Sequence, residues 1–343
     1  MELIFTTYRI HLNHTFGIAR SAHDWYDIIL IYLKDGEIMG RGEAAPSLRY
    51  NESTERILSV LKQKVKLPDD CSNRDIIWNY ILPQLKGINA LEAAFSMALW
   101  DWWGQKCEKP VFNLMDFKTE KLPLTSFTIA IGELDEIGQK IDEADPYPIL
   151  KVKLGTPTMD RDIMTEIRRH TDKVIRIDAN EGWEPETALE LTKWLADQNV
   201  EFVEQPFPAD QLDKTAALKA KSPLDIYADE NSINSADIPQ IAHAFDGINI
   251  KLMKCGSLEE GKRMINLARF YDMKIMLGCM VETSVGITAA AQLAGMVDRV
   301  DLDGNLLINN DPYLGVKVEE GRLVLPNGNG LGLKLNSDSE NLL

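Results

Sequence analysis

The chain has 343 residues and a formal net charge of −16, with 45% hydrophobic and 26% charged residues. This is the composition of a globular protein of about two domains, and its acidity excludes strong binding to nucleic-acid phosphates or anionic membrane surfaces. No apolar run reaches the roughly 18 residues that are needed to cross a bilayer.

The first 120 residues carry strand and helix patterns in separate segments. Residues 28–33 predict an apolar strand, and Lys34-Asp35-Gly36 predicts a turn into a second strand that ends near residues 43–46. A helix follows from Asn89 to Gly104, and Glu92, three residues beyond Asn89, would complete a capping box. Its apolar face would hold Leu91, Ala94, Phe95, Ala98, Leu99 and Trp102. We therefore expect residues 1–120 to form an α+β capping domain.

From residue 121 onward, short apolar runs alternate with amphipathic stretches such as residues 186–198 and 258–271. The expected strands are residues 124–131, 149–154, 174–178, 201–204, 226–229, 248–252, 275–279 and 300–303. Eight such strands joined by helices favour an α/β fold, a (β/α)7β TIM-like barrel over residues 121–310. We expect the tail, residues 311–343, to pack back on the capping domain and complete it.

An open, doubly wound sheet is the structural alternative. Such a sheet binds phosphate through a glycine-rich loop that follows an early strand. The glycine-rich segment of this chain, residues 328–332, lies at the wrong end and has the wrong spacing. The closed barrel is therefore the preferred prediction.

Three carboxylates, Asp178, Glu204 and Asp229, end three successive expected strands. A parallel barrel brings the C-terminal ends of its strands to one rim, so these carboxylates would lie close together and repel one another. A hard divalent cation relieves this repulsion by taking carboxylate oxygens, and Mg²⁺ is the most plausible one. The alternative is that each residue only caps the helix that follows its strand, which explains Glu204 poorly.

Three lysines accompany these carboxylates. Strand alternation sends Lys151 and Lys153 to the same face, toward the interior of the barrel. Lys251 ends a strand four places further on and would face Lys153 from across the barrel. Two opposed amines could act as acid and base on one substrate. Alternatively, each lysine only neutralises a neighbouring carboxylate.

The chain resembles the enolase superfamily, and within it the muconate-lactonizing subgroup. The matching motifs, in order, are Lys151-Val152-Lys153, Asp178-Ala179-Asn180, Glu204-Gln205-Pro206, Asp229-Glu230 and Asn249-Ile250-Lys251. The resemblance implies a Mg²⁺ site made by the three carboxylates, acid and base roles for Lys153 and Lys251, and supporting roles for Lys151, Asn180 and Glu230. Enzymes of this kind remove a proton from the carbon beside a carboxylate, and the metal stabilises the enediolate that forms.

The eighth strand indicates which reaction the site performs. None of the five histidines falls at a strand end, which sets aside the branch that uses a histidine base. Asp301 and Asp303 lie on one face with Leu302 pointing away, so they could seat a cation, cap a helix or pair with a lysine. A similar Asp-x-Asp in the dipeptide epimerases holds the α-ammonium group of the substrate. The resemblance therefore implies a dipeptide epimerase, an isomerase that inverts the C-terminal α-carbon of its substrate.

The side-chain preference of such an enzyme would depend on loops around the rim. Two expected lid loops, residues 16–26 and 46–53, offer Arg20, Arg49 and Tyr50, and an arginine there could pair with an acidic substrate. Met280 and Glu282 follow the seventh strand, and Glu282 would repel an acidic substrate if it faced the pocket. Ala-Ala and Ala-Glu, both products of peptidoglycan turnover, are the expected substrates.

Two other functions remain open on these residues. A lactonizing enzyme or a succinylbenzoate synthase-like lyase would keep the lysines and the metal but act on substrates without an amine. A noncatalytic Mg²⁺-binding barrel would bind metal without exchanging protons. The scattered positions of the four cysteines argue against a disulfide framework and favour a cytoplasmic protein. The superfamily commonly forms symmetric assemblies, so we also expect a homo-oligomer.

Overall fold

A computed structural model describes residues 1–343 except 19–20, 64, 118–120, 157 and 338–343. The chain opens with an antiparallel sheet in the order β1-β2-β3, formed by Glu2–Ile18, Ser21–Asp35 and Ile38–Ala44. Residues 28–33 are buried at its centre, as the apolar run predicted. The expected lid loop at residues 16–26 differs, because its described residues mostly continue β1 and β2, with Phe16 opposite His23.

The helical part of the capping region follows the sheet. Its elements are η1 (Leu48–Tyr50), α1 (Thr54–Lys62), α2 (Arg74–Ile81), η2 (Leu82–Gln84), α3 (Asn89–Lys106) and α4 (Val111–Leu114). The capping box predicted for α3 is wrong, because Ile88 is the N-cap residue and its side chain makes no cap. The Glu52 carboxylate accepts from the backbone N–H groups of Asn89 and Ala90 instead. The single apolar face predicted for α3 is also wrong, since this helix is buried on nearly all sides and passes Gly104.

The eight predicted strands form one parallel sheet with the neighbour order β4 to β11. Their bounds are β4 (Phe127–Ile129), β5 (Ile149–Lys153), β6 (Val174–Asp178), β7 (Val200–Glu204), β8 (Asp225–Ala228), β9 (Gly247–Ile250), β10 (Lys274–Gly278) and β11 (Arg299–Asp301). A single parallel bridge between Thr125 and Val300 joins the first strand to the last. The predicted barrel is therefore confirmed, with its seam held by one bridge and nearby side chains.

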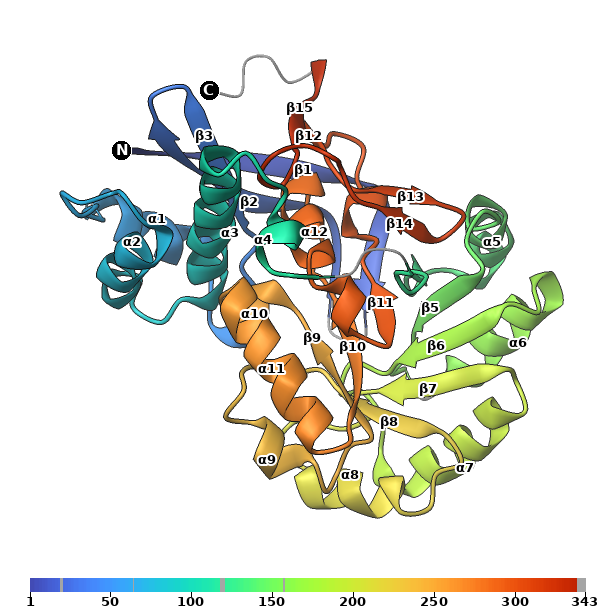
Figure 1. Cartoon of the computed structure of the whole chain (residues 1–343). Coiled ribbons are helices and arrows are strands. Elements are labelled where there is room, and N and C mark those ends of the chain that lie inside the picture. The colour runs from blue at the N-terminus through green and yellow to red at the C-terminus, as the bar shows by residue number, and fades with distance from the viewer. Residues whose placement is uncertain (19–20, 64, 118–120, 157, 338–343) are drawn as a thin grey trace.

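Helices cover the outside of this barrel, as Figure 1 shows, and the capping sheet lies beyond one end of the strands. The helical elements are η3 (Leu134–Glu136), α5 (Ile137–Glu143), α6 (Asp160–His170), α7 (Pro185–Ala196), α8 (Leu212–Lys219), α9 (Ile238–Ile241), α10 (Leu252–Cys255), α11 (Leu258–Phe270), α12 (Ser284–Ala291), η4 (Ala294–Met296) and η5 (Gly304–Leu306). All eight residues of α12 are buried, because this helix packs against both β3 and α3. It thereby joins the barrel to the capping region.

The C-terminal tail returns to the capping region. Its short strands are β12 (Tyr313–Leu314), β13 (Lys317–Glu319), β14 (Arg322–Val324) and β15 (Lys334–Leu335), and β12 pairs with β15 while β13 pairs with β14. The Tyr313 hydroxyl donates to that of Tyr32 in β2, and the Leu331 N–H donates to Asp101 in α3. The tail thus contacts both the sheet and the main helix of the cap. In the described residues no helix is long and apolar enough to cross a membrane.

Candidate active site

Three carboxylates meet at the C-terminal rim of the barrel. Asp178 ends β6, Glu204 ends β7 and pairs with Asp178 in the sheet register, and Asp229 directly follows β8. One oxygen of each residue lies within 4.8 Å of the other two, and each residue is at most 2% exposed. Three hard oxygen donors so close together, with water excluded, fit the coordination that Mg²⁺ takes from carboxylates. The residues that the sequence placed at this rim are therefore brought together.

The two opposed lysines each contact a different carboxylate of this triad. Lys153 Nζ lies 2.7 Å from Asp178 Oδ2, and Lys251 Nζ lies 2.8 Å from Asp229 Oδ2. Lys251 follows β9, four strands from β5, so the two amines approach the triad from different sides of the barrel. Burial disfavours the charged amine of Lys251, but the carboxylates of Asp229, Glu204 and Asp178 together outweigh it and raise the lysine pKa. Lys251 is therefore protonated and able to donate a proton.

Lys151 lies two residues before Lys153 in β5 and is 1% exposed. Its Nζ is 2.7 Å from both Glu204 Oε2 and Asp301 Oδ2, and 3.4 Å from Asp178 Oδ2. Burial alone would neutralise this amine, but the surrounding carboxylates raise its pKa well above the ordinary value. Lys151 therefore carries a fixed positive charge between the triad and the eighth strand.

Two further residues support the triad: Asn249, which stands in a matching motif but was assigned no role, and Lys254, which the sequence did not single out. Asn249 donates from Nδ2 to Glu204 Oε1 at 2.6 Å, and the buried Lys254 donates to the carboxylate and backbone oxygens of Asp229. Residues that orient metal ligands in this way tune their affinity. A signal existed for both, because Asn249 shares the strand face of Lys251 and Lys254 lies one helical turn beyond it.

The eighth strand pairs its two carboxylates with the first strand of the barrel. Asp301 accepts from Ser126 Oγ at 2.6 Å in addition to Lys151, and Asp303 accepts from the Thr128 N–H at 2.6 Å. Burial and the neighbouring Asp301 charge raise the pKa of Asp303 to about 7. Asp301 is thus held by a lysine, as one of the alternatives for this pair proposed, and Asp303 is the carboxyl that a further cation would stabilise.

The supporting residues implied by the family resemblance lie beside the triad. Asn180 is 5% exposed, and its N–H donates to Asp178 Oδ1 at 3.0 Å. Its backbone is left-handed, with φ of 45°, as is that of the next residue, Glu181, with φ of 66°. Glu230 is 5% exposed and directly follows Asp229. Left-handed conformations are unfavourable for such residues and concentrate at functional sites.

The expected lid residues are placed differently from one another. Arg49 binds both oxygens of Glu181, at 2.8 and 2.6 Å, so the guanidinium expected to meet an acidic substrate already has a carboxylate partner. Tyr50 is half-buried at the end of η1 beside it. Arg20 lies outside the described residues.

Met280 and Glu282 follow β10, as expected, and Met280 is half-buried. Glu282 is 1% exposed, and its carboxyl group accepts from the Met280 N–H at 2.8 Å. Burial and the nearby Glu43 raise the pKa of Glu282 to about 8. At neutral pH this carboxyl group is therefore largely protonated and would repel an acidic substrate less than an ionised carboxylate would.

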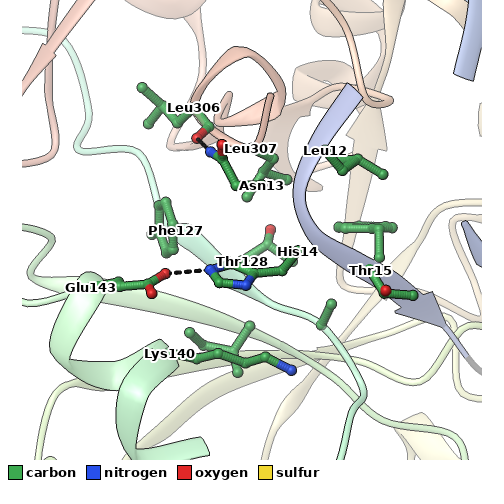
Figure 2. A pocket seen from close by; sticks show the side chains of 13 residues that line it. Leu12, Asn13, His14, Thr15, Phe127, Thr128, Lys140, Glu143, Leu306 and Leu307 are labelled. Atoms are coloured by element: carbon green, nitrogen blue, oxygen red, sulfur yellow. Dashed lines mark hydrogen bonds and ion pairs between the residues drawn. The ribbon is translucent and has the colours of Figure 1, made fainter. Parts of the chain in front are cut away.

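A small cavity lies beside the rim rather than over the triad. It has a volume of about 60 Å³ and is lined by residues of β1, β4 and α5, together with Leu306 and Leu307. In Figure 2 the His14 ring points toward Glu143, and His14 Nε2 is hydrogen-bonded to Glu143 Oε2 at 2.6 Å, which ties β1 to α5. The triad does not line this cavity, so it flanks the candidate site. Its connection to the site is Thr128, which also binds Asp303.

Comparisons with known proteins agree with this geometry. The family described as "Enolase C-terminal domain-like" matches residues 135–339. The chain is 37% identical to an L-Ala-D/L-amino acid epimerase of Flavobacterium johnsoniae over 98% of this chain and 100% of that protein. It is also 37% identical to an L-Ala-D/L-Glu epimerase of Bacteroides thetaiotaomicron, over 97% of this chain and 88% of that protein.

A solved structure resembles this one over nearly its whole length. It is the dipeptide epimerase of Cytophaga hutchinsonii complexed with Mg and D-Ala-L-Val, with a TM-score of 0.91 and 25% identity. The match covers 98% of this chain and 96% of that chain. Together with the family match and the full-length relatives, these findings show that the chain belongs to the enolase C-terminal domain-like family.

Proposed function

We propose that this protein is a dipeptide epimerase, an isomerase that inverts the C-terminal α-carbon of a short dipeptide. The observation that carries the proposal is the rim itself, where three carboxylates within 4.8 Å of one another are contacted by Lys153 and Lys251 from different strands. The full-length relatives named as epimerases support the same reaction.

The triad of Asp178, Glu204 and Asp229 would hold Mg²⁺. When bound, Mg²⁺ supplies positive charge that stabilises the carboxylate end of the substrate as negative charge develops beside the α-carbon. The remaining chemistry belongs to the chain. Lys151 supplies a fixed positive charge close to the same group, and Asn249 and Lys254 hold the triad in place.

The two lysines would exchange the proton of the α-carbon. In one direction the Lys153 amine takes the proton from one face, and the protonated Lys251 gives a proton to the opposite face. The C–H bond that breaks on one face is thus replaced by one on the other, and the reverse direction exchanges the two roles. Opposed placement of two acid–base groups makes inversion possible without turning the substrate.

The N-terminal ammonium group would bind at the eighth strand. Asp303 is buried with a raised pKa, and a nearby cation would favour its charged form. Asp301 is already bound by Lys151, so it contributes to the site mainly by extending the charge network from the triad to Asp303. Two charged anchors fix both ends of a dipeptide and disfavour longer chains.

We further infer an alanine-containing dipeptide, Ala-Ala or Ala-Glu, as substrate. The named relatives act on dipeptides that begin with L-Ala, which supports the first residue. A homo-oligomer and a cytoplasmic location are part of the same proposal. The four free cysteines, of which Cys255 is buried and the others are half-buried, support a reducing compartment.

The test is hydrogen exchange in D₂O with a set of Ala-Xaa dipeptides, followed by NMR with and without added Mg²⁺. We expect deuterium at the C-terminal α-carbon, inversion of that centre, and loss of both when the metal is chelated. N-acetylated dipeptides, which lack the ammonium group, should exchange far more slowly. Absence of exchange with every dipeptide would refute the proposal, and turnover only of substrates without an amine would favour the lyase alternative.

A further inference from the structure

Arg49 lies in η1, the short helical segment that connects the capping sheet to α1. Its guanidinium meets Glu181 in a paired, two-bond arrangement, with Nε 2.8 Å from Oε2 and Nη2 2.6 Å from Oε1. The two residues are 132 positions apart in the sequence, and the Glu181 side chain is only 9% exposed. Paired contacts of this kind are stronger and more directional than single ones, especially with one partner shielded from water.

Glu181 is itself fixed to the catalytic rim. It lies three residues beyond Asp178, its N–H donates to the Gln205 backbone oxygen at 2.9 Å, and its Oε1 also accepts from the Ala209 N–H at 2.9 Å. Gln205 in turn accepts from the Asp229 N–H through Oε1 at 2.9 Å. The carboxylate that receives Arg49 is therefore connected to the loops that carry all three triad residues.

The backbone at this point is strained in a way that serves the contact. Asn180 and Glu181 are consecutive residues with positive φ, and Gln205 has φ of 38°. Such conformations are costly for residues other than glycine and persist where the surrounding structure enforces them. They turn the chain after Asp178 so that residue 181 faces the capping region.

We propose that Arg49 and Glu181 form a latch that fixes the segment 46–53 over the rim, so that Arg49 is a positioning residue for every substrate of the site. This inference rests on the proposed dipeptide epimerisation for its kinetic test alone. It assigns Arg49 a role other than recognition of an acidic side chain, since Nε and Nη2 of its guanidinium already bind both carboxylate oxygens of Glu181. Because the latch acts on the lid segment, its loss lowers turnover of neutral and acidic dipeptides by the same factor.

The kinetic test compares Arg49→Gln, Glu181→Gln and the double variant on Ala-Ala and on Ala-Glu. We expect kcat/KM to fall by about 10-fold to 100-fold in each single variant, equally for both dipeptides. The double variant should be no worse than either single one, because both remove the same contact. The matched control is Arg169→Gln, which breaks an exposed arginine–glutamate pair on α6 and should leave both rates unchanged. A loss confined to Ala-Glu in Arg49→Gln, with Glu181→Gln unaffected, would overturn the latch.

A second measurement is independent of turnover. The N–H groups of Tyr50, Asn51 and Glu52 donate within the segment to Ser47 and Leu48 oxygens, so their hydrogen exchange reports its order. We expect faster exchange of these amides in both latch variants and no change in Arg169→Gln. Unchanged protection in Arg49→Gln and Glu181→Gln would overturn the latch. If the wild-type protein turned over no dipeptide, the proposed function would fail while this measurement still decided the latch.

Discussion

Buried charge lies at both ends of the barrel, but it is arranged differently at each. At the N-terminal end, which we call the floor, Arg176 and Arg299 share the Glu201 carboxylate at 2.9 and 2.7 Å. Both guanidinium groups also lie near Phe202, which stacks on Tyr227 with centroids 4.2 Å apart. Arg176 completes its contacts by donating to the Val300 backbone oxygen. The floor is a closed set of protein partners.

At the rim three carboxylates lie close together, whereas at the floor two arginines share a single carboxylate. Asp178, Glu204 and Asp229 lie together. Lys151 binds more than one carboxylate, and Lys153 and Lys251 each bind a carboxylate that a metal would also bind. Such contacts can be exchanged for contacts with a ligand, whereas those of the floor cannot without exposing a buried charge. The same strand alternation therefore produces a structural plug at one end and a reactive site at the other.

The largest expected effect is loss of the amines at the rim. Lys153→Ala and Lys251→Ala should each lower the rate of epimerisation by at least about 10³-fold, because each removes one of two acid–base groups. Each variant should retain α-proton exchange with only one of the two epimers of the substrate, which NMR in D₂O resolves. The control Lys214→Ala changes an exposed lysine on α8 and should have no effect. Full epimerisation by either rim variant would contradict the assigned roles.

Mg²⁺ should stabilise the fold through the residues of the rim and not through those of the floor. At concentrations about 100-fold above its Kd, Mg²⁺ should stabilise the wild-type fold by about 3 kcal/mol, measured by urea unfolding. Asp178→Asn should abolish this stabilisation, and calorimetric titration should show loss of binding. Arg176→Met at the floor should retain it. A Mg²⁺ effect that persisted in Asp178→Asn would place the metal elsewhere.

Much of the barrel could be predicted because its strands have strong local signals. The strand expected at residues 174–178 matches β6, whereas the one expected at 124–131 is reduced to Phe127–Ile129, since only a bridge at Thr125 closes the seam. The long strand β1 was missed because polar residues such as Asn13 interrupt its pattern. That residue is held by the tail, where its N–H donates to the Leu307 oxygen. Strand formation there depends on partners nearly 300 residues away.

The residues of the site also divide into those that local sequence patterns predict and those that depend on distant partners. The triad and the lysines could be found from spacing, because a residue at the end of a barrel strand has a predictable position. Partners that meet across the fold could not. The pairing of Arg49 with Glu181 and the cap that Glu52 gives to α3 join segments that no local pattern relates. Geometry of this kind needs the tertiary structure.

Loss of an arginine at the floor should lower the stability of the fold without lowering the catalytic rate. Arg176→Met removes one of the two cations that share Glu201, and Arg299 still neutralises the remaining carboxylate. We expect a loss of about 3 kcal/mol in the free energy of unfolding, the low end for breaking a buried pair. The kcat of the folded protein should stay within about twofold, because the Arg176 guanidinium binds Glu201 and the Val300 backbone oxygen at the floor. A large fall in kcat at unchanged stability would show that the two ends are not independent.

The smallest effect is a difference in pH dependence between the two ends. At the floor, burial raises the pKa of Glu201, but Arg176 and Arg299 outweigh it and lower that pKa below 4.5, so this stability is lost as the pH falls toward acid. At the rim, burial and Glu43 raise the pKa of Glu282 from 4.5 to about 8. The folded state then binds the extra proton, and stability falls as the pH rises from about 4.5 to about 8.

Glu282→Gln isolates the contribution of the rim to this pH dependence. The amide oxygen can still accept from the Met280 N–H, but the side chain no longer ionises. Unfolding in urea at pH 5 and pH 9 should show a larger fall in stability for the wild-type protein than for the variant. The loss of stability at acid pH, which depends on Glu201, should be the same in both proteins. An equal fall at alkaline pH would mean that Glu282 is already ionised and that the rim does not store this proton.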